Sequence, residues 1–170
     1  MAKSGFPTPS KVSSEQSKVK QMMIFAYDHI GIILADAVPI AQTVNKEYYT
    51  DFISKKLKNA LRRKRPLQPL ILHDNARCHT AQHVTGPWTM GWEVLPHPSY
   101  SPDLSPPDFN LFPKLKVPMR GKRYATLEDL SVAVKAQIRS LNSEGLDGIE
   151  KLPQRWESVI RSKGDYIEGL

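Results

Sequence analysis

Two short apolar runs predict a β-hairpin near the start of the chain. They occupy residues 22–27 and 32–35, and the four residues between them include Gly31. Glycine adopts positive φ without strain, so this spacing favours a strand, a tight turn and a second strand. Neither run alternates with polar residues, which indicates burial of both faces. We therefore expect the hairpin to lie inside a larger sheet.

The next segment carries apolar residues at the three-to-four spacing of an amphipathic helix. It follows a cap at Asn45 or Thr43 and ends before Pro66. Its apolar positions are Tyr49, Phe52, Ile53, Leu57, Ala60 and Leu61. The stripe predicts a helix with this face turned to the core.

Two further helices are predicted in the last third of the chain. Thr126 caps the first, with Asp129 three residues later, and its apolar face is Leu127, Leu130, Val134, Ile138 and Leu141. The second starts near Pro153 and ends at Gly164. We expect it to turn three side chains inward, Trp156, Val159 and Ile160.

Between these helices, residues 69–73 and 92–95 have the pattern of short buried strands. Residues 96–118 are too rich in proline for ordinary sheet or a long helix, although residues 108–112 could open a short helix near Asp108. Strands therefore alternate with helices. This order predicts an α/β fold with a mixed sheet flanked by helices.

Composition favours one soluble intracellular domain. Among the 170 residues there is no apolar stretch near the ~20 needed to cross a bilayer and no apolar core of a secretory signal, so we expect no membrane partner. The single cysteine, Cys78, cannot form an internal disulfide or a cysteine-rich zinc site. Residues 1–20 read as a disordered lead-in, and residues 21–170 as the domain.

The net charge of +7 is concentrated in the first half of the chain. Residues 1–80 carry 13 basic and 6 acidic residues, whereas residues 81–170 carry 11 of each. One cluster of cations contains no carboxylate: Lys55, Lys56, Lys58, Arg62, Arg63, Lys64 and Arg65. Such a cluster attracts phosphate backbones, and it is also compatible with a solvated helix face.

Two aspartates lie where a site is expected. Asp74 follows a predicted buried strand, and Asp108 lies in the proline-rich segment. Paired carboxylates are ligands for a hard divalent cation, and two-metal phosphoryl transfer draws on such groups. The alternative is local: Asp74 could begin an Asx-turn and Asp108 could cap a helix.

A zinc site or a nucleophilic pair is a weaker hypothesis for this region. A zinc site would use His73, Cys78, His79 and His97. Adjacent Cys78 and His79 side chains point apart on a regular backbone, and no second cysteine helps. The tryptophans Trp88, Trp92 and Trp156 are most simply core or interface residues.

Several motifs in order resemble the catalytic domain of mariner-family DNA transposases. The central ones are residues 73–81, 92–97 and 100–109, with similar stretches at 42–49, 62–66, 152–156 and 164–166. The resemblance covers roughly residues 18–169. It implies an RNase H-like fold in which three aspartates hold two Mg²⁺ or Mn²⁺ ions for cut-and-paste DNA transposition, with DNA as partner, a possible homodimer and a nuclear location.

By this resemblance Asp74 matches the second catalytic aspartate and Asp108 the third. Asp103 belongs to the neighbouring motif as a turn residue, and Asp28 matches the hairpin turn. The strand bearing the first aspartate and the helix-turn-helix region have no counterpart before Met22. We therefore expect an RNase H-like domain truncated at its N-terminal side, with two of three catalytic carboxylates.

Three departures from the family pattern accompany the truncation. Arg77 and Cys78 replace a proline and a small residue, the spacing from Asp74 to Asp108 is one residue short, and the approach to His73 is several residues short. We expect transposase-derived DNA cleavage and strand transfer to be lost. The alternatives are a non-catalytic nucleic-acid-binding module using the basic helix at residues 45–65 and an unselected transposon remnant.

Overall fold

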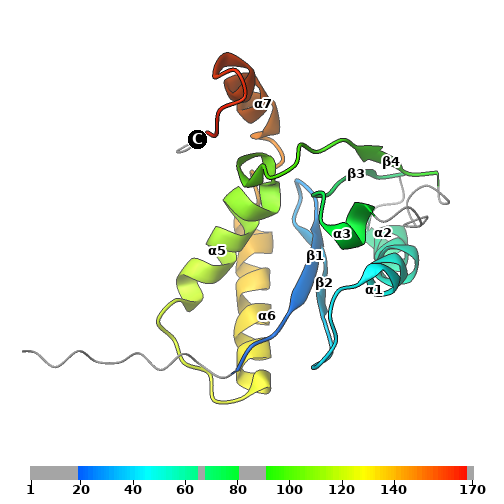
Figure 1. Ribbon diagram of the computed structural model, residues 1–170. Helices are drawn as coiled ribbons and strands as arrows, with labels where there is room; N and C mark the ends of the chain where they lie inside the picture. The colour runs from blue at the N-terminus through cyan, green and yellow to red at the C-terminus, as the bar shows by residue number, and fades with distance from the viewer. Residues whose placement is uncertain (1–18, 65–67, 81–90, 168–170) are drawn as a thin grey trace, which may run out of the picture.

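The computed structural model describes residues 19–64, 68–80 and 91–167 of the chain. Within these ranges two small sheets are accompanied by helices (Figure 1). Most of the proposed lead-in, residues 1–18, lies outside the described residues, as does Trp88. No helix in the described ranges is long and apolar enough to cross a membrane.

The predicted hairpin is confirmed as the first sheet. Strand β1, Met23–Tyr27, pairs antiparallel with β2, Ile32–Ala37. In the turn, Asp28 Oδ1 accepts hydrogen bonds from the N–H groups of Ile30 and Gly31 at 2.9 and 3.0 Å. Asp28 is thus a turn residue, as its local sequence indicated.

A second sheet consists of β3, Leu70–Leu72, and β4, Glu93–Leu95, which pair in parallel. The expectation that the hairpin lies inside a larger sheet is wrong for the described strands, because the two sheets are hydrogen-bonded only within themselves. Nor is β3 fully buried, since Leu70 is 55% exposed. Apolar packing, rather than a backbone ladder, joins the sheets.

The predicted helix begins at the expected cap and supplies that packing. It runs through α1, Lys46–Asp51, a π-helical stretch η1, Phe52–Leu57, and α2, Lys58–Lys64. Asn45 Oδ1 accepts from Tyr48 N at 2.9 Å. The predicted stripe forms one core cluster with Ile33 of the first sheet, Ile71 of the second sheet and Trp92, which directly precedes β4.

The other face of the hairpin is covered by α5, Phe112–Lys116, and α6, Leu127–Glu144 (Figure 1). Leu111, Leu115 and Leu141 pack there against Ile32. Thr126 and Asp129 form the predicted capping box at the start of α6. Helices therefore cover both faces of the hairpin, but burial is less complete than its apolar pattern predicted, because every residue of β1 is only partly buried.

The proline-rich segment is more helical than expected. It forms a 3₁₀ turn η2, Pro102–Leu104, a π-helical stretch η3, Pro107–Leu111, then α5 and a second 3₁₀ turn η4, Val117–Met119. Each of these four stretches has proline in its first two positions, where the missing N–H costs least. Successive short helical turns therefore replace one long helix.

The last helix is confirmed, but its predicted orientation is wrong. Helix α7 covers Leu152–Arg161 and contacts η2, away from both sheets (Figure 1). Leu152 and Arg155 are its buried residues, whereas Trp156 is 41% and Ile160 76% exposed. Only the side of α7 that contacts η2 is covered, and the side that carries Trp156 is exposed to solvent.

We expect Gly31→Ala to lower the free energy of unfolding by about 2–4 kcal/mol, because φ at Gly31 is +152° and a Cβ there would lie 2.6 Å from Asn142 Oδ1. That oxygen accepts from Ile32 N at 2.7 Å. Gly121→Ala is the matched control, since Gly121 has φ +78° with nothing within 4 Å, and should cost about 1 kcal/mol. Urea unfolding measures both; equal losses would contradict the close-contact argument.

Candidate active site and nucleic-acid interface

Asp74 lies two residues beyond the end of β3 and is half exposed, with 51% of its side chain accessible. Its Oδ1 accepts from Ala76 N at 3.1 Å, which is the Asx-turn considered from the sequence. The same oxygen lies 2.6 Å from His79 Nδ1. The short helix α3, Arg77–Thr80, reverses the chain and places the His79 side chain against Asp74. This contact with the candidate carboxylate was not predicted from the sequence.

Aromatic rings pack behind Asp74. The Tyr49 ring centroid lies 4.0 Å from that of His79 and 6.0 Å from that of His73. Burial lowers the pKa of His73 to about 4, with the neighbouring His79 adding to the decrease. His73 is therefore neutral at pH 7. Burial also raises the pKa of Tyr49, and the Asp74 carboxylate contributes to that rise.

Asn75 joins the two motifs that the family resemblance picked out. Its Nδ2 donates to the carbonyl oxygen of His97 at 2.5 Å and to Ser99 Oγ at 3.4 Å. Because β3 and β4 are parallel, their carboxyl ends lie at one edge of the sheet, and this amide bridges the loops that follow them. The order of the motifs is visible in the sequence, whereas the contact of Asn75 with His97 and Ser99 follows from the parallel pairing of the two strands.

Asp108 lies in the first turn of η3 and is exposed. Its N–H donates to Ser105 O at 2.8 Å, and η3 shows no side-chain cap. Nearby, burial raises the pKa of Tyr27, and the carboxylates of Asp108 and Asp147 raise it further. Asp108 is thus close enough to Tyr27, the last residue of β1, to affect its pKa, and it is not the capping residue that the local alternative required.

Arg155 supports the segment that carries Asp108. Its guanidinium carbon lies 3.8 Å from the Phe109 ring centroid, and its Nη1 donates to Asp103 O at 2.8 Å. Asp103 Oδ2 accepts from Ile167 N at 3.3 Å. Asp103 is therefore a buried turn residue, as expected, and Arg155 is a buried structural cation that helical periodicity alone had not singled out.

The described residues do not assemble a complete metal site. Their hydrogen bonds and ion pairs do not join Asp74 to Asp108, and no group of three His, Cys, Asp or Glu side chains among them is placed to hold a metal ion. Carboxylate oxygens suit Mg²⁺ or Mn²⁺ chemically, but two exposed carboxylates are fewer than the three that the mariner resemblance implies. The zinc set around His73 and Cys78 is not assembled either.

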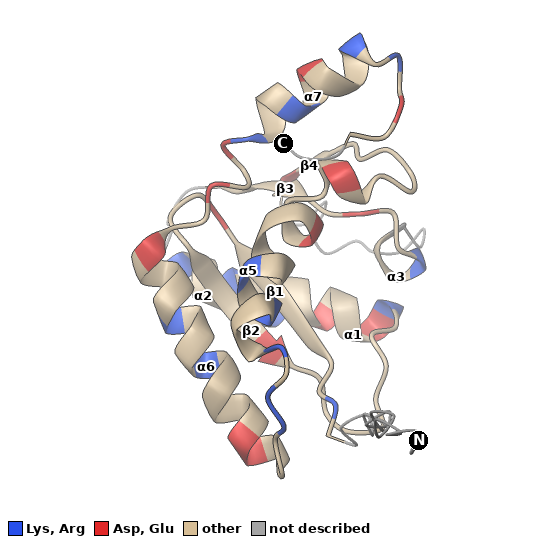
Figure 2. Cartoon of the chain, turned by 90° about the vertical axis from the view of Figure 1, so that its left-hand side faces the viewer, with Lys and Arg blue, Asp and Glu red and all other residues tan. Residues whose placement is uncertain are grey.

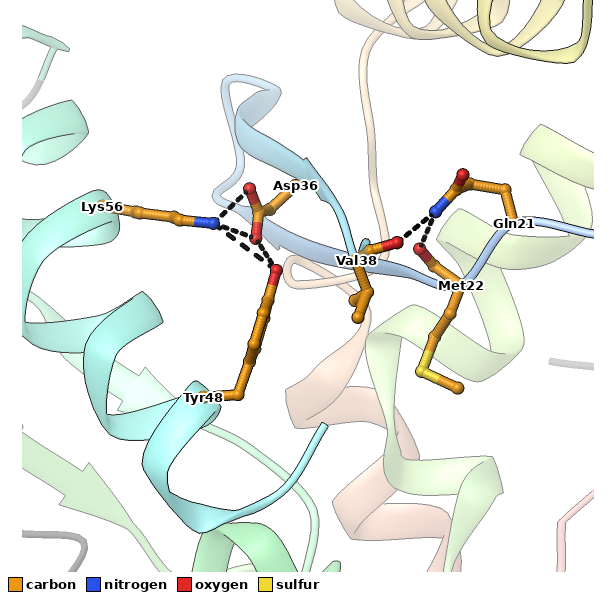
Figure 3. Close-up of polar contacts among 6 residues, drawn as sticks. All are labelled: Gln21, Met22, Asp36, Val38, Tyr48 and Lys56. Atoms are coloured by element: carbon orange, nitrogen blue, oxygen red, sulfur yellow. Dashed lines mark hydrogen bonds and ion pairs between the residues drawn. The ribbon is translucent and has the colours of Figure 1, made fainter. Parts of the chain in front are cut away.

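The predicted basic cluster is partly neutralised by the fold. Lys56 Nζ lies 2.7 and 2.8 Å from the two Asp36 carboxylate oxygens, and Tyr48 Oη donates to Asp36 at 2.8 Å (Figure 3). The Asp36 carboxylate raises the pKa of Lys56. Lys55 is ion-paired with Asp51 one turn away. Both lysines are thus engaged by carboxylates that lie outside the 55–65 segment.

The remaining cations of the cluster differ in exposure. Arg62 and Arg63 are exposed on α2, and Lys58 is half-buried. Lys64 is the last residue of α2, and Arg65 lies outside the described residues. The part of this cluster available to a phosphate backbone is therefore centred on Arg62 and Arg63.

Structural comparison defines the class of the domain. The chain is similar to the crystal structure of the catalytic domain of Mos1 mariner transposase, with a TM-score of 0.83 at 34% identity, covering 90% of this chain and 78% of that one. It also matches the Mos1 mariner paired-end complex with Mn, with a TM-score of 0.85 at 32% identity, covering 98% of this chain and 51% of that one. The fold is therefore part of an RNase H-like catalytic domain.

Sequence comparison gives the family. A family model described as "Transposase (partial DDE domain)" matches residues 3–71, starting nearer the amino terminus than the motifs indicated. The Mariner Mos1 transposase of Drosophila mauritiana is 34% identical over 172 residues, which is 96% of this chain. The Histone-lysine N-methyltransferase SETMAR of Homo sapiens is 31% identical over 155 residues, which is 88% of this chain. The chain belongs to the mariner transposase family.

The similarity covers only part of each relative. This chain spans 50% of the length of Mos1 transposase and 23% of SETMAR. Solved structures of Mos1 transposase include complexes with Mg and with Mn. Divalent metals are thus associated with the family, and the transposase origin of this chain is established.

We expect Arg155→Met to lower the free energy of unfolding by about 2–3 kcal/mol, because it removes a charge-assisted hydrogen bond and a cation–π contact from a buried position. Arg161→Met on the exposed end of α7 is the matched control and should cost less than about 0.5 kcal/mol. Chemical denaturation measures both variants. Equal effects would mean that Arg155 does not support this segment.

Proposed function

We propose that this chain derives from the catalytic domain of a mariner transposase and no longer cleaves DNA by itself. Asp74 and Asp108 are the retained catalytic carboxylates in this proposal. The supporting observation is that the described residues contain no group of three His, Cys, Asp or Glu side chains placed to hold a metal ion. The ancestral chemistry is metal-dependent strand cleavage and strand transfer, so we place its site of action in the nucleus.

The surroundings of the two aspartates explain why we expect weak metal binding. Asp74 Oδ1 already contacts His79 and the Ala76 N–H, which leaves Oδ2 as the freer oxygen. Asp108 is exposed to water. A hard cation bound by one or two carboxylates keeps most of its waters, so neither the attacking nor the leaving oxygen of a phosphodiester would be fixed in line.

Incubation of the 170-residue chain with Mg²⁺ or Mn²⁺ and duplexes carrying transposon inverted-repeat ends should give no nicks above background. Mos1 transposase on its own transposon ends serves as the active comparison. Loss of one required catalytic group commonly removes at least ~10³-fold of the rate. Cleavage by this chain that disappears in an Asp74→Ala variant would overturn the proposed inactivity, and cleavage retained in that variant would indicate a contaminating nuclease.

The alternative function is non-catalytic DNA binding by the helix at residues 45–65, alone or as a homodimer. It is favoured by the exposure of Arg62 and Arg63 on α2, since the apolar stripe of the same helix is packed in the core. The solved Mos1 structures include a paired-end complex with left transposon end, which supports DNA as partner. Contacts from such a helix go to phosphates and carry little sequence preference.

Binding by this helix should weaken steeply with salt and have a dissociation constant on the order of 10⁻⁴–10⁻⁶ M. If Arg62, Arg63, Lys64 and Arg65 each neutralise one phosphate, together they contribute about −3.6 to the slope of log K against log salt. Changing all four to Ala should remove that contribution, and Arg62→Ala/Arg63→Ala about half of it. Filter binding with duplexes of unrelated sequence measures the slope.

The matched comparison is Lys55→Ala/Lys56→Ala, which removes two cations that already have carboxylate partners. Its slope should stay within about 0.5 of the parent's, after circular dichroism has shown that both double variants are folded. An unchanged slope in the Arg62/Arg63 variant would contradict DNA binding by this helix and would mean that these arginines only form a solvated helix face.

A further inference from the structure

A second group of cations lies outside the cluster that the sequence analysis selected. Lys116, Arg120, Lys122 and Arg123 fall within eight positions, and all four are exposed. There is no acidic residue between Asp108 and Glu128. Lys114, in the same stretch, is ion-paired with Asp147 at 2.7 Å and belongs to the fold. The other four cations form the basic turn discussed below.

The basic turn keeps its charge in the folded chain. None of its four cations forms an ion pair with a carboxylate of the described residues. Of the two acidic residues that follow, Asp129 accepts from Thr126 N in the capping box, and Glu128 is exposed. The turn therefore retains an excess of positive charge, whereas Lys55 and Lys56 of the basic helix are neutralised.

The backbone fixes the shape of this surface. Arg120 N donates to Val117 O and Lys122 N to Met119 O, each at 3.2 Å, and Gly121 at φ +78° reverses the chain. Lys116 Nζ lies 5.2 Å from the Phe112 ring centroid. An open hollow of about 370 Å³ is lined by Lys116, Val117, Met119 and Arg120. Lys116 and Arg120 thus border this hollow, where their charges can attract the phosphates of a nucleic-acid backbone.

The neighbouring helix extends the positive surface. Lys135 and Arg139 lie one turn apart on the exposed side of α6, and neither pairs with a carboxylate in the described ranges. Figure 2 shows blue segments on α6 and on the connection leading into it, on the same side of the molecule. A surface of this length could contact successive phosphates rather than a single anion.

We infer that the basic turn is a second DNA-contacting surface, which binds the phosphates of duplex DNA independently of the basic helix. The inference rests on the proposal that DNA is the partner of this chain. Residues 116–123 would thus contact DNA phosphates at a place separate from the two aspartates and from the cluster at residues 55–65. Phosphate contacts from this turn hold the duplex without reading its sequence.

The test compares two double variants of the full chain. Arg120→Gln/Lys122→Gln removes one arginine and one lysine from the turn, and Arg161→Gln/Lys163→Asn removes the same pair of charges from the end of α7, where Asn tolerates φ +58° at position 163. Fluorescence anisotropy with a duplex of unrelated sequence gives the salt slope. The turn variant should flatten it by about 1.8, and the α7 variant should leave it unchanged.

Equal flattening of the salt slope in both variants would mean that only net charge matters and would contradict a specific role of the turn. An unchanged slope in the turn variant would also overturn the inference. The Arg62→Ala/Arg63→Ala variant separates the two surfaces. If this variant leaves the salt slope unchanged while the turn variant flattens it, the basic helix does not bind DNA and the inference about the basic turn is supported. If phosphatidylserine vesicles, and not DNA, bind the parent more tightly than the turn variant, the surface recognises lipid headgroups and the inference is wrong.

Discussion

The apolar stripe of the helix at residues 46–64 is the contact on which the described fold depends. The two small sheets share no ladder hydrogen bonds, and the stripe packs against residues of both. Each buried large apolar side chain stabilises by about 1.5–3 kcal/mol, so Tyr49, Phe52, Ile53, Leu57 and Leu61 together contribute an amount comparable to the whole stability of a typical domain. Packing therefore does here what strand pairing does in a continuous sheet.

The two candidate aspartates belong to different parts of this arrangement. Asp74 follows the second sheet, whereas Asp108 belongs to a segment whose Leu111 packs on the first sheet beside Ile32. Since no backbone ladder connects these sheets, no fixed register sets one carboxylate relative to the other. The position of one carboxylate relative to the other therefore depends on side-chain packing between the elements, and a catalytic pair requires that packing to be precise.

Charge in this chain serves two different purposes. Lys56 and Lys114 hold separate elements together through Asp36 and Asp147, and the partners of Asp147 keep its pKa well below the usual value. Other cations stay exposed with no ion pair in the described structure. Counting lysines and arginines along the chain cannot separate these groups, because their partners lie 20 and 33 positions away. The structure moves the emphasis from residues 55–56 to Arg62, Arg63 and the basic turn.

Local pattern determined the hairpin, the cap at Asn45, the capping box at Thr126 and the apolar stripe, because each depends on residues a few positions apart. Motif order was enough to indicate the mariner family. Tertiary structure alone decided that the strands form two sheets, that Trp156 faces outward and that His79 contacts Asp74. These outcomes depend on which surfaces meet after folding, and burial and pairing between distant segments are not encoded in the periodicity of either segment.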